Sequence, residues 1–511
     1  MSTRPRAAGT SAAASPKRPA KPAPRPSAGP AARPSVRSSG QAARRAAVER
    51  PAPGGRKKAA GAGSKAVAAA PAAARPRATR SRRLDLVLLG ASGYTGRQAM
   101  RAVWRQRPDA RWAVAGRDAG RLQALLQKMA PPGAAPPEII VADTRDAESL
   151  RALARRTRVL FNLAGPYHAT GDAVVQACID AGTHYLDLSA ETFWIQRLVR
   201  ERHASARRAG VKIIPCAGYE ALPFDLATLW AASQLRAHAG EPCASVKIVV
   251  RVTGRLTRPQ DLVSGGTAAT VTELLAHDHS DCVRDMACLL PPDAKDAPAV
   301  ARRNAVSWLP HYDDELGAVL APTLPGPFVN PPVVLRGVAL LHDATLFADD
   351  FRYREGTDIA SLLPGGRMLP KRLSLALQWG AAAALAAPLA QLGATLAGPL
   401  QFQRPLLGPL LRRVAPKQGT GPREKALDAI GYELEVHARG SRGARFHGRV
   451  VAQGHPGYRS TPEMAVCAAL GLADGSLGRT PHTGIVSPAA GLGLEAVAAM
   501  ERAGLRFLPL A

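Results

Sequence analysis

The chain has 511 residues, too many for one ordinary domain, and a formal net charge of +29. The first 83 residues hold 20 Lys or Arg and one acid, Glu49, so they carry 19 of these charges. The other 428 residues carry +10, which is unremarkable for a soluble protein and indicates no specific nucleic-acid partner. The six cysteines form no C-x-x-C pair, which argues against a disulfide framework or a thiolate zinc site and favours a reducing cytoplasm.

Residues 1–83 consist almost entirely of Ala, Pro, Arg and Ser. They lack the apolar side chains that offset the entropy of ordering, so we predict a disordered tail. Its charge suits contact with an anionic lipid or nucleic-acid surface, and equally a solubilising leader. No apolar core of a signal peptide follows the early arginines, and the repeated prolines would break the amphipathic helix of a transit peptide.

From Leu84 onward, short apolar strands alternate with helices. The predicted strands are LDLVLLG, WAVAG, EIIVAD, RVLFNLAG, THYLDLS and VKIIPC. Asp118 is placed to cap one of the helices, and another runs from Glu191 to Ala209 and stops at Gly210. Six buried strands joined by helices require right-handed crossovers. The fold class is therefore α/β, with a doubly wound parallel Rossmann sheet over residues 84–222.

After Pro223 this alternation ends, and we expect a second, α+β domain over residues 223–450. It contains a longer strand, SVKIVVRVTGRL, and a loop that leads into a helix, SGGTAATVTELLAHD. Residues 373–403 include no charged side chain but are Ala-rich and interrupted by two prolines, which favours a packed or interfacial apolar hairpin over a membrane span. We expect residues 451–511 to return to the Rossmann domain through a closing helix, SPAAGLGLEAVAAMERAG.

The turn after the first strand has three glycines in the pattern G-x-x-G-x-x-G, a variant of the dinucleotide fingerprint. Gly90 permits the tight turn, Gly93 lets the backbone approach a pyrophosphate, and Gly96 lets the new helix pack closely. The N–H groups and dipole of the helix start would then meet the phosphates. The cofactor-binding residues predicted in this turn are Gly90, Ser92, Gly93, Tyr94, Thr95 and Gly96.

The second strand indicates which dinucleotide is bound. NAD sites place an acid about 20 residues after the fingerprint, on the ribose hydroxyl. Here Arg117 holds that place and Arg121 follows one turn later, which favours the 2′-phosphate of NADP. The later strand ends supply further predicted cofactor contacts: Asp143 near the adenine, and Asn162, Ala164 and Gly165 near the nicotinamide.

Two common reductase chemistries do not match the sequence. Short-chain dehydrogenases use a Tyr-x-x-x-Lys pair, and none of the eight tyrosines has a lysine four residues later. Semialdehyde and acyl-phosphate reductases share GASGYTG but need a cysteine nucleophile at a helix start. Cys178 lies inside a predicted helix, and Cys216 ends a strand with no base beside it in sequence. Acyl-enzyme chemistry is therefore not supported.

The motifs GASGYTG, AGR, NLAGPYHATGDAVVQACIDAGTHYLDLSAE, PCAGYEALPFDL and SGGT together resemble the saccharopine dehydrogenase family. Within it, they resemble the branch of trans-acting enoyl reductases. The resemblance runs from about Leu84 to the C-terminus and includes GHPGYRSTPEM. It implies an NAD(P)-dependent oxidoreductase with a Rossmann domain and a second mixed α/β domain, and the branch implies reduction of acyl double bonds during lipid synthesis.

The chain departs from the family at two strand ends that we expect to face the cleft. It has LSAE at 188–191 where LSGE is common, and GYEALPFD at 218–225 where G-F-D-S-x-P-S-D is common. Hydride transfer belongs to the nicotinamide, so the protein must orient it and move a proton. We select Tyr167 and Tyr219 as the catalytic proton donors. Other candidates, each also explained as a structural polar group, are His168, Asp187, Glu191 and Glu220.

No metal site is expected. The cluster HDHSDC at 277–282 contains ligand residue types, but it has no second cluster and is predicted as a solvated loop at a helix end.

Three hypotheses remain open. The first is a cytoplasmic NADP-dependent oxidoreductase acting on a hydrophobic acyl substrate, with residues 373–403 touching lipid as a peripheral membrane contact. The second is C–N oxidoreduction of the saccharopine type, for which Arg251, Arg255 and Arg258 would have to meet a substrate with several carboxylates. The third is a nucleotide-binding lipid-surface protein without turnover.

Overall fold

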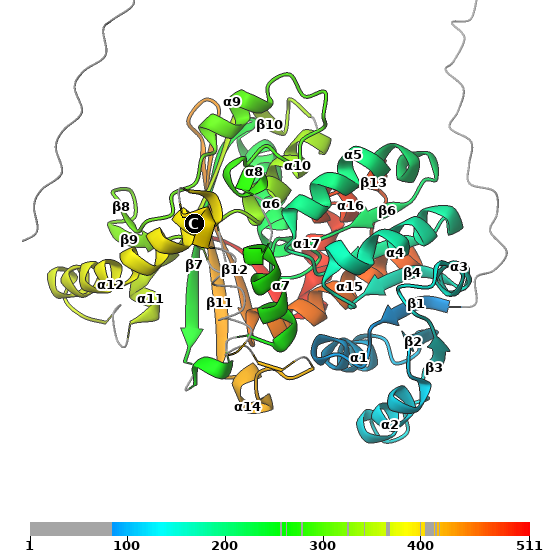
Figure 1. Cartoon of the computed structure of the whole chain (residues 1–511). Helices are drawn as coiled ribbons and strands as arrows, with labels where there is room; N and C mark the ends of the chain where they lie inside the picture. The colour runs from blue at the N-terminus through cyan, green and yellow to red at the C-terminus, as the bar shows by residue number, and fades with distance from the viewer. Residues whose placement is uncertain are drawn as a thin grey trace, which may run out of the picture. The chain divides into compact units, whose positions relative to one another are not determined.

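A computed structural model of the chain describes residues 84–255, 258–261, 263–276, 280–323, 327–341, 343–363, 368–398, 400–403, 413, 416–417 and 419–510. The basic tail, residues 1–83, lies outside the described residues, as do residues 277–279 of the HDHSDC cluster. All of the described residues belong to one structural unit, drawn in colour in Figure 1.

The first sheet has seven parallel strands in the order β3-β2-β1-β4-β5-β6-β13. The six predicted strands are all present, and the doubly wound fold class is confirmed. The seventh, β13, was not predicted because two residues are too few to show an apolar pattern. The strands are β1 (Leu84–Leu89), β2 (Trp112–Gly116), β3 (Glu138–Val141), β4 (Thr157–Asn162), β5 (His184–Asp187), β6 (Lys212–Ile214) and β13 (Gly484–Ile485).

The helices of the first sheet follow from right-handed crossovers, which place α1 and α2 on one face and α4 and α5 on the other. The predicted cap is confirmed, since the Asp118 carboxylate accepts a hydrogen bond from the N–H of Arg121 at the start of α2. Helix α15, from the far end of the chain, packs against α1, β1 and β4. These helices are α1 (Tyr94–Gln106), α2 (Ala119–Met129), α3 (Ala147–Arg155), α4 (Tyr167–Ala181), α5 (Thr192–Arg208) and α15 (Thr461–Asp474).

The second sheet is mixed, in the order β14-β12-β11-β7-β10-β9-β8, with only β7 and β10 parallel. Helix α6 (Leu222–Ala239) leads from the first sheet and packs on β7, β11 and β12 (Figure 1). The predicted boundary after residue 222 falls at the start of α6, and residue 450 lies within β12. The strands are β7 (Cys243–Gly254), β8 (His311–Asp313), β9 (Ala318–Ala321), β10 (Phe347–Asp358), β11 (Ile430–Gly440), β12 (Arg445–Gln453) and β14 (Leu505–Leu510).

The remaining helices are mostly short. They are α7 (Gly265–Ala276), α8 (Ser280–Arg284), α9 (Ala297–Arg303), α10 (Asn330–Leu341), α11 (Ile359–Leu362), α12 (Lys371–Ala397), α14 (Glu424–Leu427), α16 (Pro488–Leu492) and α17 (Glu495–Ala499), with single turns η1 (Pro259–Asp261), η2 (Gln401–Gln403), η3 (Pro456–Ser460) and η4 (Met500–Ala503).

Two predicted elements differ in the structure. The prediction of an apolar hairpin is wrong, because residues 371–397 form the single helix α12, with Pro388 inside it. The Ala- and Leu-rich flanks have high helix propensity, and this outweighs the backbone hydrogen bond that the proline removes. The prediction of a single closing helix is also wrong, because the segment forms two short helices, α16 and α17. Gly493 adopts φ +86° between them and ends α16.

Candidate functional site

The glycine turn has the geometry that its sequence predicts. Gly90 adopts φ +86°, and a Cβ atom there would lie 2.9 Å from the backbone nitrogen of Ala164. A Cβ atom on Gly96 would lie 2.6 Å from the carbonyl oxygen of Ala91. Both positions therefore require glycine, because the turn off β1 and the first turn of α1 leave no room for a side chain.

The start of α1 offers unused hydrogen-bond donors. Within the described part of the chain, no backbone hydrogen bond uses the N–H groups of Thr95 or Gly96. The backbone carbonyl oxygen of the adjoining Ser92 accepts a hydrogen bond of 3.1 Å from the Arg97 guanidinium. Free N–H groups at a helix start, with no side chain at Gly93 or Gly96, fit the pyrophosphate of a dinucleotide.

A segment from the second half of the chain, residues 419–424, lies against this helix start. The Tyr94 hydroxyl donates to the Pro422 carbonyl oxygen at 2.6 Å, and Arg97 donates to the carbonyl oxygen of Gly419 at 2.9 Å. An ion pair of 2.9 Å joins Arg101 to Glu424. Tyr94, predicted as a cofactor contact, is thus also the residue that this segment packs upon.

Arg117 and Arg121 are both exposed beyond the end of β2. No hydrogen bond or ion pair among the described residues involves the guanidinium of Arg117, which leaves it available to a phosphate. Asp143, at the end of β3, is paired with Arg145 at 2.8 Å, and this partner lowers the pKa of the Asp143 carboxyl to about 2. The region is therefore cationic, as the 2′-phosphate of NADP requires.

Asn162 ends β4 with its side chain fully buried. Its amide oxygen accepts from the N–H of Ala164 at 3.0 Å, and its amide nitrogen donates to the Tyr185 hydroxyl at 3.2 Å. Asn162 therefore shapes the loop after β4 by internal hydrogen bonds. Gly165, in the same loop, lines the cavity described next.

A cavity of about 1750 Å³ extends from the glycine turn to the second sheet. Its walls are predominantly apolar, and it reaches α12 at Leu392 and Leu396. Of the predicted site residues, the structure brings together around it Gly93, Tyr94, Thr95, Gly96, Gly165, Tyr167 and Tyr219. Those that do not line it are Gly90, Ser92, Arg117, Arg121, Asp143, Asn162 and Ala164.

One wall of the cavity comes from two motifs whose roles the sequence did not reveal. The Tyr458 hydroxyl lies 2.6 Å from both the backbone nitrogen of Ser264 and the hydroxyl of Thr267, which joins GHPGY to the start of α7. Thr461 accepts from the N–H of Tyr219 at 2.8 Å, and His455 also lines the cavity. Their polar residue types were the available signal, but their convergence depends on tertiary contacts.

The two predicted proton donors differ in surroundings. The Tyr167 hydroxyl donates to the Asn162 carbonyl oxygen at 3.3 Å and accepts from the N–H of Leu188 at 3.3 Å. Tyr219 packs its ring on Tyr432, with centroids 4.8 Å apart, and no described hydrogen bond uses its hydroxyl. Burial raises the pKa of both phenols well above the usual value, so both stay protonated.

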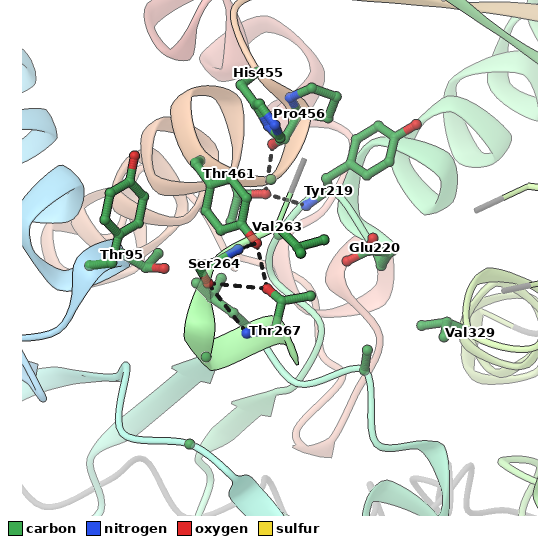
Figure 2. Close-up of a pocket in the computed structure, with 18 of the residues that line it drawn as sticks. Thr95, Tyr219, Glu220, Val263, Ser264, Thr267, Val329, His455, Pro456 and Thr461 are labelled. Carbon is green, nitrogen blue, oxygen red and sulfur yellow. Dashed lines mark hydrogen bonds between the residues drawn. The ribbon is translucent and has the colours of Figure 1, made fainter. Parts of the chain in front are cut away.

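Glu220, next to Tyr219, lines the same wall of the cavity (Figure 2). Burial raises the pKa of its carboxyl to about 7. A second carboxyl, Glu355, accepts from Tyr353 at 2.7 Å and from Asn330 at 3.1 Å, and burial raises its pKa to about 7 as well. Glu220 is thus a carboxyl that faces the cavity and changes its charge near neutral pH.

The other candidates at the strand ends have structural partners. The buried Glu191 carboxylate accepts from the N–H groups of Tyr167 and His168 at 2.9 and 2.7 Å, and lies 2.7 Å from the His168 ring nitrogen Nδ1. It therefore caps α4. Asp187 accepts from the Tyr185 hydroxyl at 2.8 Å and from the N–H of Ser189 at 2.9 Å, and burial raises the pKa of its carboxyl to about 6.

Cys178 and Cys216, the two cysteines considered as nucleophiles, are both fully buried. All six cysteines are free and buried, and Cys178 lies inside α4, as predicted. Burial raises the pKa of the Cys216 thiol well above its usual value, and its sulfur is 2.8 Å from the Ser189 carbonyl oxygen. A thiol held protonated in this way is a poor nucleophile.

A doubly wound sheet with a glycine turn, free helix-start donors and exposed arginines after β2 defines an NADP-binding oxidoreductase. The family model for the saccharopine dehydrogenase NADP binding domain matches residues 86–214. The trans-acting enoyl reductases of Mycobacterium bovis and Mycobacterium tuberculosis are each 30% identical to the chain over 435 residues, which is 83% of this chain and 97% of theirs. That of Mycobacterium ulcerans is 28% identical over 434 residues, with the same coverage.

The chain therefore belongs to the saccharopine dehydrogenase family, together with the trans-acting enoyl reductases, as the motifs predicted. Among solved structures, a saccharopine dehydrogenase from Saccharomyces cerevisiae is similar with a TM-score of 0.41 and 15% identity, covering 83% of this chain and 99% of that one.

Proposed function

We propose that the protein uses NADPH to reduce a carbon–carbon double bond of a hydrophobic acyl substrate. The observation that carries the proposal is the cavity, whose largely apolar wall continues from the glycine turn to Leu392 and Leu396 of α12. An acyl chain lying along this wall would place its reactive end near the nicotinamide, beside the ends of β4 and β6. The names of the enoyl reductase relatives agree with this choice of substrate.

The saccharopine-type alternative is disfavoured by the positions of its three arginines. Arg255 lines the cavity. Arg251 instead pairs with Asp358 at 3.3 Å and with Glu435, neither of which lines the cavity, and Arg258 borders a separate pocket. A substrate with several carboxylates needs convergent cations, and of these three arginines only Arg255 lies at the cavity.

For the proton, we propose the Glu220 carboxyl, with Tyr219 beside it. Hydride addition to a conjugated double bond leaves an enolate, which must take up a proton. A carboxyl whose pKa is about 7 is protonated in part at neutral pH and gives up its proton readily. The phenol of Tyr167 is the less suitable donor because its O–H already donates a hydrogen bond to the Asn162 carbonyl oxygen.

The direct test is NADPH oxidation with enoyl thioesters of increasing chain length. We expect turnover to improve with chain length, because longer chains bury more apolar surface in the cavity. Leu396→Trp should narrow the α12 end and lower kcat/KM for the longest substrates by at least about tenfold, while the shortest are unaffected. Leu377→Trp, on an exposed part of the same helix, is the matched control.

Equal losses for short and long chains in Leu396→Trp would mean that the acyl chain does not reach α12. Tight NADPH binding without oxidation of NADPH, for any enoyl or amino-acid substrate, would favour the third hypothesis, a nucleotide-binding protein without turnover.

We also propose that the first half of α12 touches anionic lipid. Within the described residues, α12 is the one helix long and apolar enough to cross a membrane by length and composition, with 22% of its most apolar window buried, and one such helix is weak evidence of a span. Leu373, Leu377 and Trp379 are about half exposed, next to the cationic Lys371 and Arg372. A surface contact suits this combination.

Sedimentation with phosphatidylglycerol vesicles is expected to bring down the wild-type protein and much less of the double variant Leu377→Glu with Trp379→Glu. The control, the double variant Leu494→Glu with Leu508→Glu, places the same two charges on exposed apolar positions outside α12. Equal sedimentation of all three proteins would contradict the α12 contact and point instead to the basic tail.

A further inference from the structure

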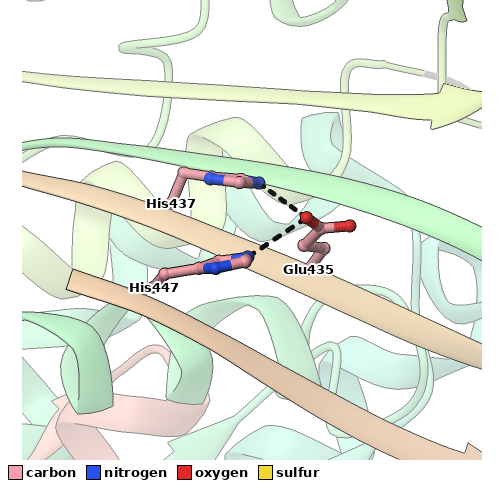
Figure 3. A group of neighbouring side chains, drawn as sticks. All are labelled: Glu435, His437 and His447. Atoms are coloured by element: carbon pink, nitrogen blue, oxygen red, sulfur yellow. Dashed lines mark hydrogen bonds and ion pairs between the residues drawn. The ribbon is translucent and has the colours of Figure 1, made fainter. Parts of the chain in front are cut away.

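Three side chains with metal-ligand chemistry meet on the second sheet, away from the cavity. Glu435 and His437 are two residues apart on β11, so they point to the same face of the sheet. His447 on β12 is the cross-strand partner of His437 in the antiparallel register. Figure 3 shows both imidazole rings turned toward the Glu435 carboxylate.

Two of the three separations between the ligand atoms match those around a bound metal ion. The Glu435 oxygen Oε1 lies 3.2 Å from Nε2 of His437 and 3.1 Å from Nε2 of His447. All three ligand atoms are within 4.8 Å of one another. Nitrogen and oxygen ligands about 2.0–2.1 Å from a tetrahedral zinc ion are about 3.3–3.4 Å apart, so an ion between these atoms needs only small side-chain rotations.

The surroundings hold the carboxylate in this orientation. Its other oxygen, Oε2, pairs with the guanidinium of Arg251, which Asp358 also holds at 3.3 Å. Oε1 is thereby left facing the imidazoles. Metal sites commonly use such a partner behind a ligating carboxylate.

A hydrogen bond of 3.1 Å between Nε2 of His447 and Oε1 of Glu435 accounts for the position of His447, but not for that of His437. Nε2 of His437 is buried, yet no hydrogen bond of acceptable geometry reaches it among the described residues. The two rings stack with centroids 4.5 Å apart and 18° between their planes, which directs both nitrogens to the same side. The neighbouring Lys247 is already paired, with Asp313 at 2.7 Å and Glu315 at 3.0 Å.

We propose that Glu435, His437 and His447 bind a divalent transition-metal ion of the zinc type, with three protein ligands and solvent at the remaining position. His447 is 38% exposed, which gives the ion a path of entry. The donor set of two imidazoles and one carboxylate suits zinc. It does not suit magnesium or calcium, which prefer oxygen ligands only. The ion would cross-link β11 and β12. The site lies away from the cavity and is independent of the proposed reductase activity.

The test is isothermal titration of chelator-treated, full-length protein with zinc chloride. We expect one zinc ion per chain and a rise in melting temperature on binding. Loss of a residue that only supports a metal ligand typically weakens metal binding by about 10–100-fold. His437→Ala and His447→Ala each remove a ligand, so each should weaken zinc binding by more than this and abolish the rise in melting temperature. His311→Ala, an exposed histidine on β8 of the same sheet, should change neither.

Unchanged NADPH binding by the alanine variants checks that they fold. The proposal is overturned if the wild type binds no zinc, or if His437→Ala and His447→Ala bind it as tightly as His311→Ala does. Absorption spectra with cobalt(II) add a second readout, since a four-coordinate site gives intense visible bands that both alanine variants should lack.

Discussion

Arg117→Glu is expected to weaken NADPH binding by about 10–100-fold and to leave NADH binding nearly unchanged. The guanidinium of Arg117 is exposed at the end of β2, with no partner among the described residues. A charge-assisted hydrogen bond to a phosphate contributes about 1.5–3 kcal/mol, and about 1.4 kcal/mol corresponds to a factor of ten. Fluorescence titration of the purified protein with both nucleotides measures the effect.

Arg155→Glu provides the control, because it reverses another exposed charge, on helix α3 of the same domain. It should leave NADPH affinity within about twofold at physiological ionic strength, since distant surface charges are screened. A similar loss in both variants would indicate that only the overall charge matters. An equal loss of NADH and NADPH affinity in Arg117→Glu would mean that this arginine does not contact the 2′-phosphate.

Glu220→Gln is expected to lower the rate of enoyl reduction by about 10²- to 10⁴-fold, the usual contribution of a positioned general acid. The glutamine keeps the size of the side chain but has no proton to transfer at this step. NADPH affinity should be unaffected, because Glu220 lies in the loop between β6 and α6 rather than in the glycine turn. Single-turnover measurements with saturating NADPH separate the two effects.

The pH profile gives a second readout of the same prediction. Burial raises the pKa of Glu220 to about 7, so the protonated form dominates below that pH and is lost as the pH rises through it. The wild-type rate should therefore be constant at low pH and fall above about pH 7, whereas Glu220→Gln should show no such fall. If Tyr219→Phe lowers the rate by the amount expected for Glu220→Gln, while Glu220→Gln keeps both the wild-type rate and its fall above about pH 7, the phenol is the donor and the Glu220 proposal is wrong.

The first six strands of the Rossmann sheet were predictable because each contains a short run of apolar residues. The glycine turn and the place of Arg117 after β2 were predictable for a different local reason. The fingerprint and the arginine have a fixed spacing along the chain. The second half of the site was not predictable. Tyr458 reaches Ser264 across nearly 200 positions, and no local pattern encodes that contact.

Two further features show the same division between local and tertiary information. The alternation of Glu435 and His437 is visible in the sequence, but the third residue of the group, His447, depends on the register of the β11–β12 hairpin. The two prolines led to the wrong prediction of a hairpin at residues 373–403, because α12 continues through Pro388.

The order in which the chain is synthesised has a consequence for this fold. Strand β13 completes the first sheet beside β6, and α15 covers β1 and β4, but both lie near the C-terminus. The Rossmann sheet therefore emerges from the ribosome long before its last strand and one of its covering helices exist. A chain that stopped at residue 222 would lack β13 and α15 and would leave part of that sheet bare, so synthesis of the nucleotide-binding half alone does not complete the fold.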